Sequence, residues 1–223
     1  MSSVLYQLPH SPYCLPITRL FAALGQPLEV RNVSNGDRAE LIRLTGGACY
    51  HVPVLVEGDR MVFDGSEGGG DGLDLPRYVD SRHAGGRLFP AAVEGLQRLL
   101  LPIIEDELEG LTFKLADLHY VPSIADPVER IMVIRHKERR FGRGCLDQWR
   151  DQREALFSAA TRRLEPFALM LEHHPFLLGT APVYADFALW GVLANLTWKD
   201  ANPLPPLPPV EAWYRRLGSY RFS

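Results

Sequence analysis

A serine, a tyrosine and a cysteine lie close together near the N-terminus, in the run Ser11-Pro12-Tyr13-Cys14. The run follows a short apolar segment and precedes residues with helical spacing, so it is predicted to form a turn between a strand and a helix. Unpaired N–H groups and the positive end of the helix dipole stabilise an anion at such a turn. A thiol that arrives beside the Ser11 hydroxyl would therefore be favoured as the thiolate, which is the nucleophilic form.

Each of these side chains also has a purely structural interpretation. Ser11 could serve only as a helix N-cap, which is a common role of serine. Cys14, at the start of an amphipathic helix, is more often a buried small hydrophobic residue than a reactive thiol. Tyr13 carries a further hydroxyl near the turn. We predict that Ser11 holds the thiolate, with Tyr13 as the reserve hydrogen-bond donor and Cys14 as a third catalytic candidate.

The elements that must position this turn form an α/β segment in residues 1–83. Short β-branched and aromatic runs alternate there with helical spacing, and glycine and proline separate them. The predicted order is βαβαββα, with strands at 4–8, 27–33, 53–56 and 60–63 and helices at 14–24, 37–44 and 73–79. This order is that of a small sheet domain.

The remainder of the chain is predicted to be a helical domain. Residues 84–87 read as a linker, and beyond it apolar residues recur at helical spacing with almost no strand signal. Helices are expected at 91–118, 127–141, 146–172, 184–198 and 210–217, separated by glycine or proline. Short links between them favour a bundle in residues 88–223.

Composition limits the class of function. The chain has 223 residues, 46% of them hydrophobic and 23% charged, and a formal net charge of −3, which is typical of a soluble globular protein and not of a nucleic-acid binder. The three cysteines are too scattered for a disulfide framework or a zinc site, so we expect no metal and a reducing compartment. No apolar run approaches the length of a membrane helix. We expect a cytoplasmic protein that does not bind membranes.

Three motifs resemble the glutathione transferase superfamily. Ser11-Pro12-Tyr13-Cys14-Leu15 is similar to the active-site turn of its bacterial serine-type members, and His51-Val52-Pro53-Val54-Leu55 to its Val-Pro segment before the third strand, where the proline is cis. Phe176-Leu177-Leu178-Gly179 with Tyr184-Ala185-Asp186-Phe187 resembles the family's signature at a buried helix of the second domain. The resemblance implies a thioredoxin-like N-terminal domain followed by an all-α domain, and a homodimer.

The resemblance also implies a placement for glutathione. The backbone of Val52, before Pro53, would pair with the cysteinyl unit as an added strand does. The γ-glutamyl end would meet a carboxylate and a hydroxyl after the fourth strand. Here the family's pattern is altered to 64–72 DGSEGGGDG, so either Asp64 with Ser66, or Ser66 with Glu67, could fill that role.

A basic cluster in residues 130–143 has no counterpart in that pattern. Arg135, Arg139 and Arg143 are spaced to share one helix face, and a solvated surface is the usual meaning of such a run. Binding of an anionic substrate, including glutathione's own carboxylates, is the main alternative, and nucleic acid is disfavoured by the overall charge.

We therefore predict a glutathione transferase-like enzyme that uses glutathione as co-substrate against an unidentified small electrophile. The alternatives are a glutathione-dependent thiol reductase that uses Cys14, and a non-catalytic binding or assembly protein of the same fold.

Overall fold

The computed structural model describes residues 3–66 and 71–222, and its first part is built on a four-stranded sheet. The strands are β1 (Ser3–Gln7), β2 (Glu29–Asn32), β3 (Val54–Glu57) and β4 (Arg60–Phe63). Their order is β2-β1-β3-β4, with β1 parallel to β2 and antiparallel to β3, and with β3 antiparallel to β4. The predicted order of strands and helices in this half is confirmed.

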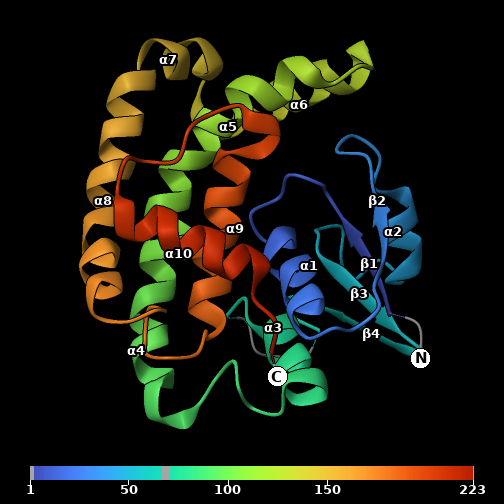
Figure 1. Ribbon diagram of the computed structural model, residues 1–223. Helices are drawn as coiled ribbons and strands as arrows, with labels where there is room; N and C mark the ends of the chain where they lie inside the picture. The colour runs from blue at the N-terminus through green and yellow to red at the C-terminus, as the bar shows by residue number, and fades with distance from the viewer. Residues whose placement is uncertain (1–2, 67–70, 223) are drawn as a thin grey trace.

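Helices cover both faces of the sheet. Helix α1 (Cys14–Ala23) lies between the sheet and the helical part of the molecule, and α2 (Ala39–Leu44) lies on the outer side (Figure 1). Neighbouring residues of β1 face opposite ways, as the pleat requires: Leu5 belongs to the main core, whereas Tyr6 packs with Leu41 of α2. Helix α3 (Asp74–Val79) continues as a π-helical turn, η1 (Asp80–Ala84).

The second part is helical, as predicted, but two of the predicted helices are interrupted. The first breaks after Pro102, which has no N–H for the helical ladder, and a π-helical segment replaces the regular α-helix there. The second breaks at Gln152. The elements are α4 (Ala91–Pro102), η2 (Ile103–Leu108), α5 (Glu109–Ser123), α6 (Pro127–Phe141), α7 (Cys145–Asp151), α8 (Arg153–His173), α9 (Tyr184–Leu196), η3 (Trp198–Asp200) and α10 (Pro208–Ser219). None of the helices in the described parts of the chain is long and apolar enough to span a bilayer.

Helix α9 is the buried centre of this part, and Asp186 fixes its start. The Asp186 carboxylate accepts hydrogen bonds from the Leu177 N–H at 3.0 Å, the Val183 N–H at 3.0 Å and the Trp213 indole N–H at 2.8 Å. Val183 cannot return a side-chain bond, so only one half of a capping box is formed. The helix nonetheless begins at Tyr184, as the sequence predicted.

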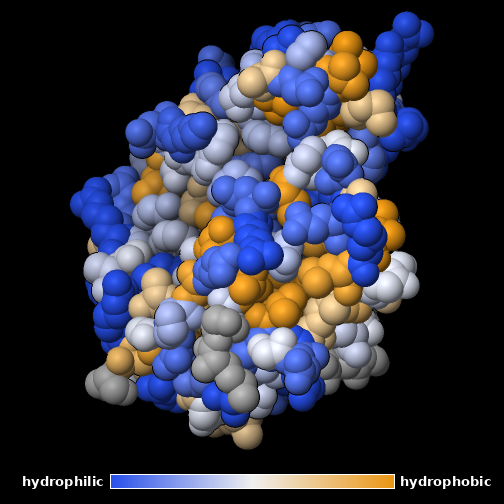
Figure 2. Space-filling view, turned by 90° about the vertical axis from the view of Figure 1, so that its right-hand side faces the viewer, coloured by the Kyte–Doolittle hydropathy of each residue, from blue (hydrophilic) through white to orange (hydrophobic). Residues whose placement is uncertain are grey.

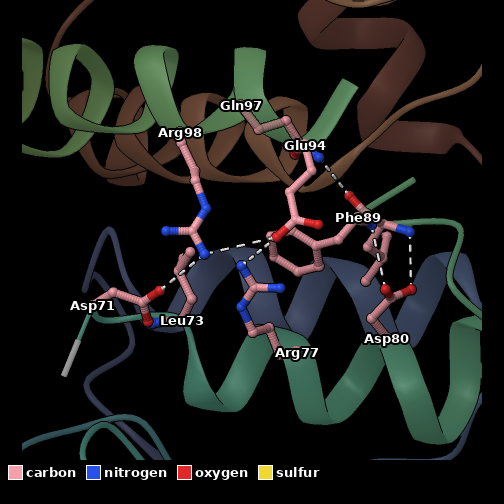
Figure 3. Close-up of polar contacts among 9 residues, drawn as sticks. Asp71, Leu73, Arg77, Asp80, Phe89, Glu94, Gln97 and Arg98 are labelled. Carbon is pink, nitrogen blue, oxygen red and sulfur yellow. Dashed lines mark hydrogen bonds and ion pairs between the residues drawn. The ribbon is translucent and has the colours of Figure 1, made fainter. Parts of the chain in front are cut away.

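Buried polar contacts join the two parts at the linker (Figure 3). The Asp80 carboxylate accepts the backbone N–H groups of Leu88 at 2.9 Å and Phe89 at 3.3 Å. The fully buried Gln97 donates to the Leu88 carbonyl and accepts the N–H of Ala185, each at 3.0 Å. Buried hydrogen bonds therefore join the segment between the sheet and α4 to Asp80 on one side and to the helical part on the other.

Candidate active site

The turn before α1 is closed by Ser11 itself. Its carbonyl accepts the N–H groups of Cys14 at 3.1 Å and Leu15 at 3.0 Å, and its Oγ accepts the N–H of Tyr13 at 3.3 Å. Pro12 and Pro16 have no N–H to offer. The expectation that free amide donors meet an anion here is therefore wrong, because the turn is tight enough for Ser11 to use all of them.

The Ser11 hydroxyl is left as the donor of this turn. Its oxygen already accepts one bond, so its hydrogen can be given to another group. The side chain is mostly buried but lines a cavity of about 500 Å³. Anion stabilisation at the turn therefore rests on one hydroxyl and on the α1 dipole.

Cys14 lies behind the turn and is fully buried. Burial raises the pKa of its thiol to about 11, although a hydrogen bond with Ser11 acts in the opposite direction. Because the thiol stays protonated at neutral pH, it is a weak acceptor for the Ser11 hydroxyl and a poor nucleophile.

The cavity of about 500 Å³ that Ser11 lines is the larger of two adjoining cavities. It lies between the turn, the region around α2, and helices α5 and α6. Val52 lines it together with His51, and the Val52–Pro53 peptide is cis, as the family resemblance implied. Among the described residues, none forms a hydrogen bond with the backbone N–H or carbonyl of Val52. An extended ligand could pair with this backbone in the way that an added strand does.

A second cavity, of about 250 Å³, adjoins the first and has a different charge. Tyr13, His51 and Val52 line both cavities, whereas Asp64 and Glu105 line only the smaller one. Burial raises the pKa of Glu105 to about 7, and the neighbouring Asp106 adds to the effect. The smaller cavity is therefore lined by the carboxyl groups of Asp64 and of Glu105, which is only partly ionised at neutral pH. Such groups suit a cationic group such as an ammonium.

The other predicted contacts after β4 have different surroundings. The Ser66 hydroxyl accepts the N–H of Phe63 at 3.0 Å, and Ser66 is not among the residues that line the smaller cavity. Asp74, at the start of α3, accepts the N–H of Gly65 at 2.9 Å and so holds the loop. Glu67 lies outside the described residues. Asp64 is thus the predicted glutamyl-binding residue that the structure brings to a cavity.

Tyr13 is shared by the linings of the two cavities. The residue is 42% exposed, and its hydroxyl donates to the Glu105 carbonyl at 3.3 Å. Burial of the hydroxyl and the nearby Glu109 and Glu105 carboxylates raise its pKa well above the usual range. The phenol is therefore a neutral donor that is already engaged across the interface between the two parts of the molecule.

Helix α9 positions the turn from behind, which sequence reasoning did not find. The Asn195 amide donates to the His10 carbonyl at 2.6 Å. A Cβ atom placed on Gly191 would lie 2.4 Å from Pro16 Cγ and 2.6 Å from the Pro12 carbonyl oxygen. A glycine within an otherwise apolar helix was the available signal, but its partner could not be read from the sequence.

The predicted face of the basic cluster is exposed, since Arg135, Arg139 and Arg143 are all open to solvent. Arg135 is exposed and pairs with Glu138 at 2.6 Å, whereas Lys137, Arg139 and Arg140 line the larger cavity. Helix α6 projects above the sheet, and hydrophobic residues appear among mostly hydrophilic ones at the top of the face in Figure 2. One side of α6 therefore contributes to the wall of the cavity, while Arg139 and Arg140 remain exposed to solvent.

Comparison with solved structures finds this fold in many glutathione transferases. Glutathione transferase GSTFuA2 from Phanerochaete chrysosporium matches with a TM-score of 0.77 and 17% identity over 100% of this chain and 99% of that one. Glutaredoxin 2 from Salmonella typhimurium, solved in complex with glutathione, gives a TM-score of 0.72 and 22% identity over 96% and 92%. A glutathione S-transferase from Sinorhizobium meliloti 1021 gives 0.71 and 18% over 98% and 89%.

No family model matches the sequence, and a search of curated proteins gives no significant match. The structural likeness therefore shows the fold, a thioredoxin-like N-terminal region followed by a helical region, as predicted.

Proposed function

We propose that this chain, which has the glutathione transferase fold, binds glutathione and transfers it to a small electrophile. The observation that carries the proposal is that the Ser11 hydroxyl and the unpaired backbone of Val52 line one cavity at the start of α1. The backbone would hold the cysteinyl unit, and the hydroxyl would donate to its sulfur. The thiolate would then form a bond to the electrophilic carbon, and the thiol proton would pass to solvent.

The placement of the two ends of glutathione follows from the charge of the cavities. The α-ammonium group of the γ-glutamyl unit would enter the smaller cavity, where Asp64 and the partly ionised Glu105 are the acidic groups. The sulfur would remain on the Ser11 side of Tyr13. In this arrangement residues 1–83 form the glutathione-binding domain, and residues 88–223 form the helical domain that covers the electrophile.

Titration with glutathione in a calorimeter tests this proposal. We expect binding to the wild-type protein and affinity about tenfold lower for Asp64→Asn, because one charge-assisted contact is lost. Asp59→Asn is the matched control: it removes the same charge from the exposed β3–β4 turn and should leave the affinity unchanged. Absence of any binding heat, with the protein folded, would instead favour a non-catalytic binding protein.

We expect Cys14 to be inert, which separates this proposal from a thiol reductase. Native Cys14 should resist a thiol-specific reagent at pH 8 until the protein unfolds, because the thiolate form is strongly disfavoured. Cys14→Ala should keep glutathione conjugation within about twofold of wild type. Loss of activity in Cys14→Ala, with normal thermal stability, would assign the chemistry to this thiol.

By likeness to the fold family we also propose a cytoplasmic homodimer. No nucleic acid or membrane partner is proposed.

A further inference from the structure

Among the described residues, the lining of the larger cavity contains four cationic and two acidic side chains. Its ionisable lining consists of the cations Arg38, Lys137, Arg139 and Arg140, the imidazoles His10, His51 and His136, the phenols Tyr13 and Tyr50, and the acids Glu109 and Asp117. Lys137 is neutralised by Asp117, with Nζ to Oδ2 at 2.5 Å. Burial raises the pKa of Glu109 to about 7, so this acid is only partly ionised at neutral pH. An excess of positive charge therefore faces the space in front of Ser11.

Two arginines of α6 supply this excess without an ion-pair partner. Within the described parts of the chain, neither Arg139 nor Arg140 is within ion-pair distance of a carboxylate. Arg140 lines the same cavity as Ser11, Tyr13 and Glu109. These guanidinium groups can therefore bind an external anion in a bidentate manner.

The deep end of the same cavity is polar as well. His10 and Asn195, both more than nine-tenths buried, keep one side-chain atom each without a hydrogen-bond partner in the described structure, His10 Nδ1 and Asn195 Oδ1. Arg38 Nη1 is a third such atom. Buried polar atoms are normally paired, so these three would be satisfied by water or by a polar ligand in the cavity.

We propose that the second substrate is an electrophile that carries a carboxylate, which Arg139 and Arg140 bind while its reactive carbon lies over Ser11. This inference rests on the proposed function, because it names the substrate class of the same site. A purely apolar electrophile would leave the two arginines without an anionic partner in the cavity.

A pair of aryl chlorides that differ by one carboxylate tests the proposal. Both a chlorodinitrobenzoate and a chlorodinitrobenzene accept a thiolate at the carbon that loses chloride, with the bonding electrons leaving on the chloride. We expect Arg139→Gln/Arg140→Gln to lower kcat/KM for the benzoate by about tenfold or more, and to change that for the neutral probe and the KM for glutathione by less than about twofold.

The matched control is Arg135→Gln/Arg143→Gln, which removes the same charge from positions that do not line the cavity and should alter neither probe. Equal losses with both probes, or a loss confined to glutathione affinity, would overturn the proposal. If no conjugation occurs, calorimetric titration with the unreactive analogues dinitrobenzoate and dinitrobenzene still measures whether the cavity prefers the carboxylate. Preferential binding of the benzoate that the double variant abolishes would support the anion site even if the transferase function failed, and equal binding of both would refute it.

Discussion

Replacement of Ser11 by alanine is expected to lower kcat/KM for glutathione conjugation about 10- to 100-fold at pH 7. All the backbone N–H groups of the turn are used by Ser11, so its hydroxyl is the main donor left for the sulfur anion. One hydrogen bond to a charged group lowers the pKa of a thiol by about one to two units. The measurement is the pH dependence of kcat/KM, together with ultraviolet difference spectra of the bound thiolate.

Tyr13→Phe distinguishes this hypothesis from the reserve donor. The Tyr13 hydroxyl is engaged with the Glu105 carbonyl, so its removal should cost much less activity than Ser11→Ala and should leave the apparent pKa of bound glutathione in place. The opposite ranking of the two variants, with unchanged glutathione affinity, would transfer the role of thiolate donor to Tyr13.

Replacement of Asp186 by alanine is expected to lower the free energy of unfolding by about 3 kcal/mol or more at pH 7.5. The substitution leaves the N–H groups of Leu177, Val183 and Trp213 buried without an acceptor, and each unsatisfied donor costs about 1–3 kcal/mol. Urea denaturation measures the loss. Glu172→Ala, at an exposed position of α8, is the control and should change stability by less than about 0.5 kcal/mol.

The pH dependence of stability gives a separate check on Asp186. Burial raises its pKa to about 6 in the folded protein, from an ordinary value of 3.8, despite hydrogen bonds that act in the opposite direction. Between these values the folded state binds more protons than the unfolded state, so the contribution of this group to the free energy of unfolding falls as pH rises through that window. Asp186→Asn should remove this slope. A slope identical to that of wild type would show that Asp186 is not its source.

Much of the fold could be predicted from the sequence, because the spacing of apolar residues and the positions of glycine and proline determine local structure. The alternation of short strands and helices in residues 3–84 is observed, and helix 127–141 is found with the predicted bounds. The interruptions at Pro102 and Gln152 were missed, since apolar spacing continues across both. Such breaks depend on how the next helix packs, which a single sequence does not contain.

The candidate site was predictable only in its local parts. Ser11, Val52 and Asp64 were found from motifs, and the structure brings each of them to one of two adjoining cavities. The role of the backbone amides was predicted wrongly, because whether a helix end is free depends on the geometry of the turn before it. The cavity-facing side of α6 was missed because it is defined by residues far away in the chain, such as Asp117, which pairs with Lys137.

The contact at Gly191 makes the serine turn a shared product of both halves of the chain. Since the Pro12 carbonyl and the Pro16 ring occupy the space of a missing side chain on α9, the turn packs directly against the backbone of the helical part. An isolated α/β half would retain its strands but would lose the contact of α9 with residues 10–16. The position of the turn before α1 therefore depends on the packing of the two halves. A fragment that ends at the linker should lack the complete candidate active site.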